Sequence, residues 1–160
     1  MGPEFSPAPL SPDVATVYVY RLADSHASKS APDVYVGDDK LFALQNGGYG
    51  VLRLPPGEHR LVAKNLGCYP AVKLDLVARG GEQAFVRFSV PAPTRPAPVE
   101  SSGHWSIDLL HLPTRVAEAR KWTDEQCQLT PGFQAVDLRV GPAEISKTKL
   151  VDGGLVERLK

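Results

Sequence analysis

The stretch from Asp33 to Lys64, DVYVGDDKLFALQNGGYGVLRLPPGEHRLVAK, decides the fold class of this 160-residue chain. Short runs with alternating apolar residues are separated by turns rich in Gly, Asn, Asp and Pro. The pattern predicts two consecutive β-hairpins that end in a Leu-Pro-Pro-Gly-Glu-His turn. Proline presets one φ angle of that turn, and we expect Gly57 to supply a positive φ before the next strand begins.

Strand patterns continue on both sides of this stretch. Residues 15–22 are apolar on most of both faces, which predicts a strand inside a sheet rather than at its edge. The expected strands cover residues 15–22, 33–37, 40–44, 49–54, 58–64, 72–77, 83–90, 104–112 and 133–140. Short strands punctuated by Gly and Pro predict a mainly β protein, an immunoglobulin-like or transthyretin-like β-sandwich of about seven to nine strands.

The remaining segments suggest how the domain is bounded. Residues 114–129 carry apolar residues at helical spacing, which predicts one packed C-terminal α-helix within a sandwich domain spanning 15–140. Residues 141–160 show no clear apolar face and are expected to form a C-terminal tail. Residues 1–14 are expected to combine a cloning remnant, ending in Glu-Phe, with a Pro/Ser-rich tether that does not pack.

Composition places the chain among ordinary globular proteins. Hydrophobic residues make up 42% of it and charged residues 22%, with 18 basic and 18 acidic side chains. This neutrality lends no support to binding of a nucleic-acid backbone or an anionic membrane surface. The sequence contains no apolar run of the length that crosses a membrane.

The two cysteines, Cys68 and Cys127, leave two readings open. Their spacing matches no zinc pattern. In an oxidising compartment they would close a loop of about 60 residues, worth about 3–4 kcal/mol in the chain-entropy model. As free thiols they would instead be two small buried side chains.

No catalytic, cofactor or metal site is expected from the motifs. The four histidines are scattered, no Gly-x-Ser-x-Gly is present, and the Gly-Gly pairs lie between strands rather than before a helix. We therefore predict a non-enzymatic protein in which the Gly, Pro, Asn and His residues between the expected strands build turns. These structural turn residues are Asn46, Gly47, Gly48, Pro56, Gly57 and His59.

Aromatic residues support a second interpretation, a carbohydrate- or peptidoglycan-binding module. Exposed tyrosines could form a stacking platform, with Tyr49 and Trp105 as ligand contacts and Trp122 as a further anchor. Tyrosines in strands are more often half-buried core residues. A coplanar, exposed pair of rings on one face would favour the glycan interpretation.

The segments Asp33–Gly37, Asn46–Tyr49 and Leu54–His59 together resemble a bacterial family of small lipoproteins of unknown function. They also resemble the short PEGA repeat, which ends in a similar Pro-Gly-x-His turn. The resemblance implies a periplasmic domain held at a bacterial membrane by an N-terminal lipid anchor that these residues do not include. We therefore expect it to bind another envelope protein or to support an envelope assembly, without a cofactor.

Overall fold

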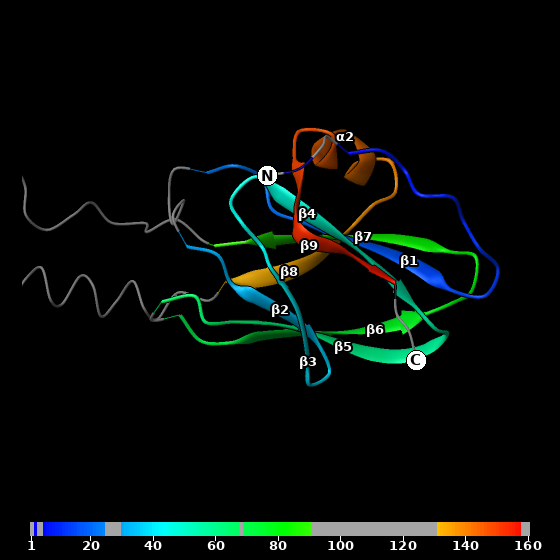
Figure 1. The fold of residues 1–160 in the computed structure, drawn as a ribbon, viewed down its shortest axis with the longest axis horizontal. Coiled ribbons are helices and arrows are strands. Elements are labelled where there is room, and N and C mark those ends of the chain that lie inside the picture. Colours follow the sequence, from blue (N-terminus) through cyan, green and yellow to red (C-terminus); the bar gives the residue numbers. More distant parts are fainter. Residues whose placement is uncertain (1, 3–4, 25–29, 68, 91–130, 158–160) are drawn as a thin grey trace, which may run out of the picture.

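The computed structural model describes residues 2, 5–24, 30–67, 69–90 and 131–157. This part of the chain contains nine strands and one short helix (Figure 1). The elements are β1 (Ala15–Tyr20), β2 (Asp33–Val36), β3 (Asp39–Ala43), β4 (Gly48–Leu54), β5 (Gly57–Lys64), β6 (Val72–Ala78), β7 (Gln83–Ser89), β8 (Gly132–Val136), α2 (Gly141–Ile145) and β9 (Lys149–Glu157). The prediction of a mainly β, sandwich-like protein is confirmed, whereas the strand expected at 104–112 and the helix expected at 114–129 lie outside the described residues.

The described strands form two sheets. One has five strands in the order β8-β7-β1-β4-β9, and the other has four in the order β3-β2-β5-β6. In the five-stranded sheet β1 runs parallel to β7, and β4 runs parallel to β9. β1 lies in the middle of this sheet and is buried along its whole length, as its two apolar faces predict.

The prediction of a second hairpin, formed by the strands on either side of Asn46-Gly47-Gly48, is wrong. β3 lies in the four-stranded sheet, whereas β4 pairs with β1 and β9 in the five-stranded sheet. The turn therefore carries the chain from one sheet to the other, and Pro55–Gly57 carries it back to β5. The physical reason is burial, because β4 is apolar on both faces and β3 begins with exposed charged residues.

The main core fills the space between the sheets. It is built from the inward-facing residues of both, including Val17 and Val19 of β1, Leu52 of β4 and Leu61 of β5. Gly50 of β4 is required by this packing, because a Cβ at that position would lie 2.3 Å from the ring of Phe42. The two sheets also approach each other at their edges, where β3 lies beside β9 and β6 beside β8.

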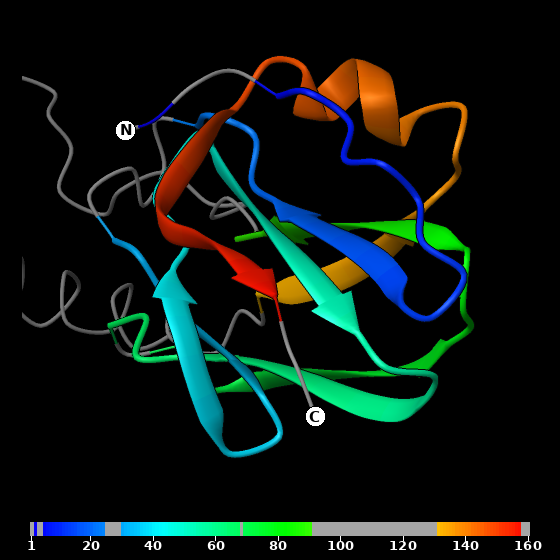
Figure 2. The ribbon, with the colours of Figure 1, turned by 45° about the vertical axis from the view of Figure 1, so that its right-hand side comes forward.

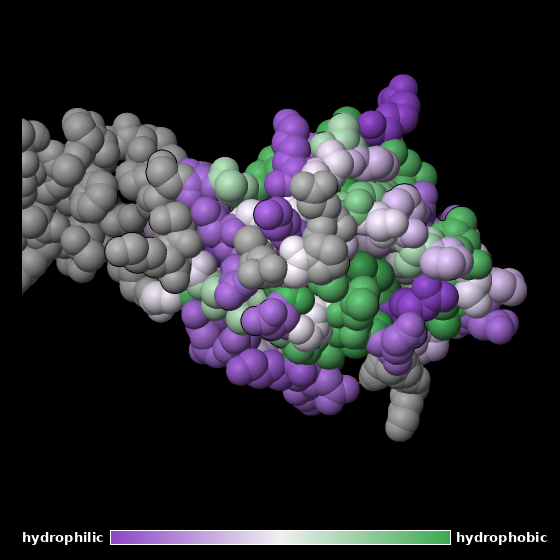
Figure 3. Space-filling view, turned by 45° about the horizontal axis from the view of Figure 1, so that its top comes forward, coloured by the Kyte–Doolittle hydropathy of each residue, from purple (hydrophilic) through white to green (hydrophobic). Residues whose placement is uncertain are grey.

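A second apolar cluster lies on the outer face of the five-stranded sheet. Tyr18, Tyr20, Tyr49 and Phe85 are buried there together with Ile145 of α2. The expectation that residues 6–12 do not pack is wrong, because the N-terminal chain runs along this face beside α2 (Figure 2). Figure 3 turns this side partly toward the viewer and shows hydrophobic areas near the top and in the lower middle of the molecule, bordered by hydrophilic side chains.

The expectation that 141–160 forms a tail is also wrong. After β8, which is shorter than the strand expected at 133–140, the chain forms α2 over the outer face and then β9 at the far edge (Figure 1). Pro142 in the first turn helps to start the helix, and Gly141 lets it approach the ring of Phe85. The apolar positions of β9 are interrupted by Gly153 and Gly154, which hides its alternation from a sequence reading.

Candidate functional site

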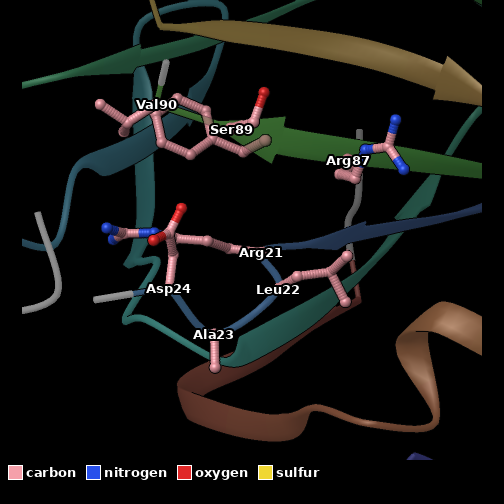
Figure 4. A pocket seen from close by; sticks show the side chains of 8 residues that line it. Arg21, Leu22, Ala23, Asp24, Arg87, Ser89 and Val90 are labelled. Carbon is pink, nitrogen blue, oxygen red and sulfur yellow. The ribbon is translucent and has the colours of Figure 1, made fainter. Parts of the chain in front are cut away.

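A pocket of about 410 Å³ lies where β1 and β7 end. These strands are parallel neighbours, so their carboxyl ends meet at one edge of the sheet. The lining comes from residues 21–24, which follow β1, and from residues 87–90 at the end of β7 (Figure 4). The pocket combines charged side chains with apolar walls and has the size of a small-molecule cleft.

Arg21 is the most buried charge of this pocket, with 3% of its surface exposed. Its guanidinium donates hydrogen bonds to the carbonyl oxygens of Ser30, at 2.6 Å, and Leu44, at 3.2 Å. Burial lowers the pKa of Arg21, and the negative charge of Asp24 acts in the opposite direction. Arg21 therefore ties the loop after β1 to the end of β3.

Arg87 belongs to a second polar network on the outer face. Its Nη1 lies 2.8 Å from each carboxylate oxygen of Glu144 in α2, and its Nη2 donates to Gln134 at 2.9 Å. The Tyr20 hydroxyl donates to the same Glu144 carboxylate. Burial raises the pKa of Tyr20, and the bond to Glu144 raises it further. This network fastens α2 to β1 and β7.

The two arginines do not form a joint anion site. In Figure 4 their guanidinium groups point away from each other, and each donates hydrogen bonds to groups of the protein itself.

Among the described residues, no group of three or more His, Cys, Asp or Glu side chains could hold a metal ion. In the same part of the chain, no helix is long and apolar enough to cross a membrane.

The residues predicted to build turns lie in the two connections between the sheets. Asn46 and Gly47 turn the chain into β4 at Gly48, and Gly47 has a φ of +73°. The Asn46 side chain also accepts a hydrogen bond from the Asp24 N–H and donates one to the Asp24 carbonyl, both at 3.0 Å. Asn46 thus holds the loop after β1 in addition to shaping its own turn.

The second connection contains Pro56, Gly57 and His59. Gly57 has a φ of +131°, a conformation that side-chain-bearing residues rarely adopt. The His59 Nε2 lies 2.7 Å from the carbonyl oxygen of Pro55. This bond closes the turn in which His59 was expected, and its partner, the Pro55 carbonyl, was not predicted from the sequence.

Tyr49, expected as a ligand contact, is buried at 4% exposure. Burial raises the pKa of its hydroxyl, and Phe5 of the N-terminal chain covers its ring at a centroid distance of 5.5 Å. Tyr18 and Tyr20 are fully buried, so these three rings offer no exposed stacking pair. Trp105, Trp122, Cys68 and Cys127 lie outside the described residues.

Sequence reasoning missed the charged residues of the pocket and of the adjoining network. Arg21 and Arg87 each stand in an otherwise apolar strand pattern, which is a usable signal for a buried, hydrogen-bonded charge. Glu144 carried no such signal, because its segment was expected to be a tail. Its role depends on α2 being brought over β7.

Fold and pocket together define a mainly β, sandwich-like domain in which the partly buried charges hold loops and a helix in place. The chain belongs to the family described as "Protein of unknown function (DUF2846)", whose match covers residues 11–103, more than half of its length. No curated protein matches the chain. The match includes β1 to β7, whereas β8, α2 and β9 lie beyond it.

Proposed function

We propose that this protein is a non-enzymatic domain of a bacterial envelope lipoprotein, held at the membrane by an N-terminal lipid anchor and facing the periplasm. Its task is to bind another envelope protein through the outer face of the four-stranded sheet. The resemblance of the Asp33–His59 pattern to small lipoproteins and PEGA repeats supports the compartment. The arrangement of side chains on that sheet supports the binding role.

The single observation that carries the binding role is a row of side chains across all four strands of this sheet. Lys40 of β3 pairs with Tyr35 of β2, Tyr35 with Val62 of β5, and Val62 with Lys73 of β6. Except for Asp39, the neighbours of these residues along each strand pack into the core, so the row points to the outer face. Lys40 and Lys73 are exposed there, Tyr35 is half-buried, and Val62 keeps only 9% of its surface exposed between them. We call these four residues the Tyr35 row.

The charges around the Tyr35 row indicate the chemistry of the partner. The ammonium group of Lys64 lies 4.2 Å from the centroid of the Tyr35 ring, and Lys40 lies 3.6 Å from the Asp33 carboxylate. Lysines therefore stand at both ends of the row and above its aromatic centre. Such a surface complements a protein face with an apolar centre and an acidic rim.

The N-terminal chain leaves this face open. Residues 6–11 lie on the outer face of the other sheet, where the Ala8 N–H donates to the Tyr18 hydroxyl at 2.9 Å. An anchor attached through this chain would hold the five-stranded sheet toward its attachment point. The Tyr35 row, on the opposite side of the sandwich, would then face an incoming partner.

Carbodiimide cross-linking in intact envelopes tests the binding role, because it joins lysines to carboxylates in direct contact. We expect Lys40, Lys64 and Lys73 to link to Asp or Glu residues of one partner protein. Lys73→Glu should abolish these links, whereas Lys149→Glu, an exposed control on β9, should leave them unchanged. Links confined to Lys147 and Lys149, or none at all, would contradict the proposed surface.

The anchor is tested separately by metabolic labelling of the natural full-length protein with a palmitate analogue. We expect a cysteine upstream of the domain to carry the label, and hydrolysis of the lipid should release the label from the protein. An unlabelled protein would remove the lipoprotein assignment and leave the binding role to the cross-linking result.

A further inference from the structure

The four-stranded sheet ends at β6, which pairs with β5 on one side and with no other strand among the described residues. β6 extends over seven residues without proline, glycine or a break in its register. The other edge strands differ, because β8 has only five residues and the pairings of β3 and β9 contain register shifts. Short length, proline and bulges keep an edge from pairing with another chain, and β6 carries only charged side chains for this purpose.

The main-chain groups of every second residue of β6 point away from β5. The Gly37 N–H, which follows β2, donates to the Arg60 carbonyl of β5 at 2.9 Å, so the main chain of Arg60 points toward β2. Asp75 lies opposite Arg60 in the register of β5 and β6, and its own N–H and C=O therefore point to the free edge. By alternation, the same holds for Lys73 and Val77. The edge thus offers a regular row of donors and acceptors.

The core-facing side chains of β6 are incompletely covered. Leu74 and Leu76 pack against the main core, yet both are only half-buried, whereas Leu61, opposite Leu74 in β5, is fully buried. Leu76 also lines an opening of about 120 Å³ whose walls come from β1, β6 and β7. The core is therefore open to solvent along β6, and a further strand at this edge would remove apolar surface from water.

A second copy of β6 matches this edge in one antiparallel register. When Leu74 lies opposite Leu74 of the second copy, Lys73 of each copy lies opposite Asp75 of the other. Both residues of each such pair have main-chain groups that point to the edge, so each pair exchanges two hydrogen bonds. Val72 lies opposite Leu76 of the other copy, so the apolar side chains continue the core-facing side of the sheet.

The neighbouring registers are unfavourable. A shift by two residues places Lys73 opposite Lys73 in one direction and Asp75 opposite Asp75 in the other, and like charges directly opposite each other are destabilising. A shift by one residue opposes main-chain groups that point to the edge to groups that point toward β5. The charges of β6 therefore select one register of self-pairing.

We propose that β6 is a self-association edge, through which two copies of this chain form a twofold-symmetric dimer. The four-stranded sheets of the two copies then join at β6 into one continuous sheet. One strand from each copy buries little area, so the dimer is weak and forms mainly at high protein concentration. The dimer goes beyond the proposed function, because it uses the edge of the sheet rather than its outer face.

Sedimentation equilibrium of the purified full chain tests the pairing. We expect the average mass of the wild-type protein to rise from 17.3 kDa toward that of a dimer as the concentration increases to about 1 mM. Lys73→Glu and Asp75→Lys should each associate about tenfold or more weakly, because like charges then face each other twice. An equimolar mixture of the two variants should recover the association, since every facing pair of the mixed dimer again joins opposite charges.

Lys40→Glu is the matched control, because it makes the same charge change on β3, at the other edge of the same sheet. Its self-association should equal that of the wild-type protein. Since Lys40 belongs to the Tyr35 row, failure of the dimer is distinguishable from failure of the outer face to bind a partner. Lys73 and Asp75 are both exposed, so the variants should fold, and circular dichroism verifies this.

Carbodiimide cross-linking of mixed isotopically light and heavy wild-type protein tests the register without any substitution. We expect a link between Lys73 of one copy and Asp75 of the other, seen as a peptide pair of mixed isotope. A wild-type protein that stays monomeric and unlinked at about 1 mM would overturn the proposal. Single variants that associate like the wild-type protein, or a mixture of variants that stays monomeric, would overturn it as well.

Discussion

The two outer faces of the sandwich begin from the same strand chemistry and end in different environments. On the five-stranded sheet, Tyr18, Tyr20 and Phe85 are at most 2% exposed, because the N-terminal segment and α2 cover them. On the four-stranded sheet, Val77 remains 65% exposed. The comparison teaches that an outer face becomes core only when another segment of the chain crosses it.

The ion pairs show the same contrast. Arg87 and Glu144 have side chains that are 26% and 21% exposed, whereas Arg60 and Asp75 are 54% and 71% exposed at a similar N–O distance of 2.8 Å. The covered pair connects a helix to the sheet, and the open pair joins two neighbouring strands in solvent. The two ion pairs have similar geometry, but they should contribute very different amounts to the free energy of unfolding.

The largest expected effect comes from removing a ring of the covered face. Phe85→Ala should lower the free energy of unfolding by about 3–5 kcal/mol, because it empties a site packed against the Tyr18 ring. Val77→Ala on the open face should change it by less than about 0.5 kcal/mol. Urea unfolding of both variants measures the difference, and equal losses would refute the distinction between the faces.

The covered ion pair should give the next largest effect. Glu144→Gln removes the charged acceptor shared by Arg87 and the Tyr20 hydroxyl, which should cost about 1–3 kcal/mol of unfolding free energy. Asp75→Asn, its counterpart on the open face, should produce no resolvable change. If Glu144→Gln left the free energy of unfolding unchanged, α2 would be held by its apolar contacts alone.

The connection that returns the chain from the covered to the open sheet depends on one glycine. Gly57→Ala should lower stability by about 1 kcal/mol or more, because its φ of +131° is strained for alanine. Gly132→Ala is the matched control, since its added Cβ would meet no atom within 4 Å and its φ is not in the left-handed region. An unchanged melting temperature for Gly57→Ala would count against this turn.

The smallest effects are expected from pH. The pKa of Tyr20 is raised in the folded state by burial and by Glu144, so its stabilisation is complete below the unfolded value of about 10 and is lost as pH rises above it. The pKa of Asp75 is lowered by its bond to Arg60, so its weaker contribution is lost in acid, as pH falls through the lowered value.

Urea unfolding midpoints between pH 8 and 11 test the alkaline effect. Tyr20→Phe should show a shallower decline than the wild-type protein, and Tyr49, whose pKa burial also raises, should account for part of the remaining decline. Identical slopes for the wild-type protein and Tyr20→Phe would mean that Tyr20 does not carry the alkaline sensitivity.

Local features of the sequence were sufficient to predict most of the strands and the backbone of the turns. Val34 and Tyr35 point to opposite faces as their alternation requires, and Gly57 has the positive φ expected of it. The candidate site was harder to predict from the sequence. Arg21 and Arg87 could have been recognised as charges within apolar strands, but their partners Ser30, Leu44 and Glu144 come from distant parts of the chain.

By itself, the sequence determined a mainly β chain with turns at given positions, because alternation and glycine conformation are properties of a few neighbouring residues. Only the tertiary structure decided which strands pair, that Asn46-Gly47 joins two sheets, and that α2 and residues 5–11 cover one outer face. Those outcomes depend on how much apolar surface distant segments can remove from water together, a quantity that no local pattern contains.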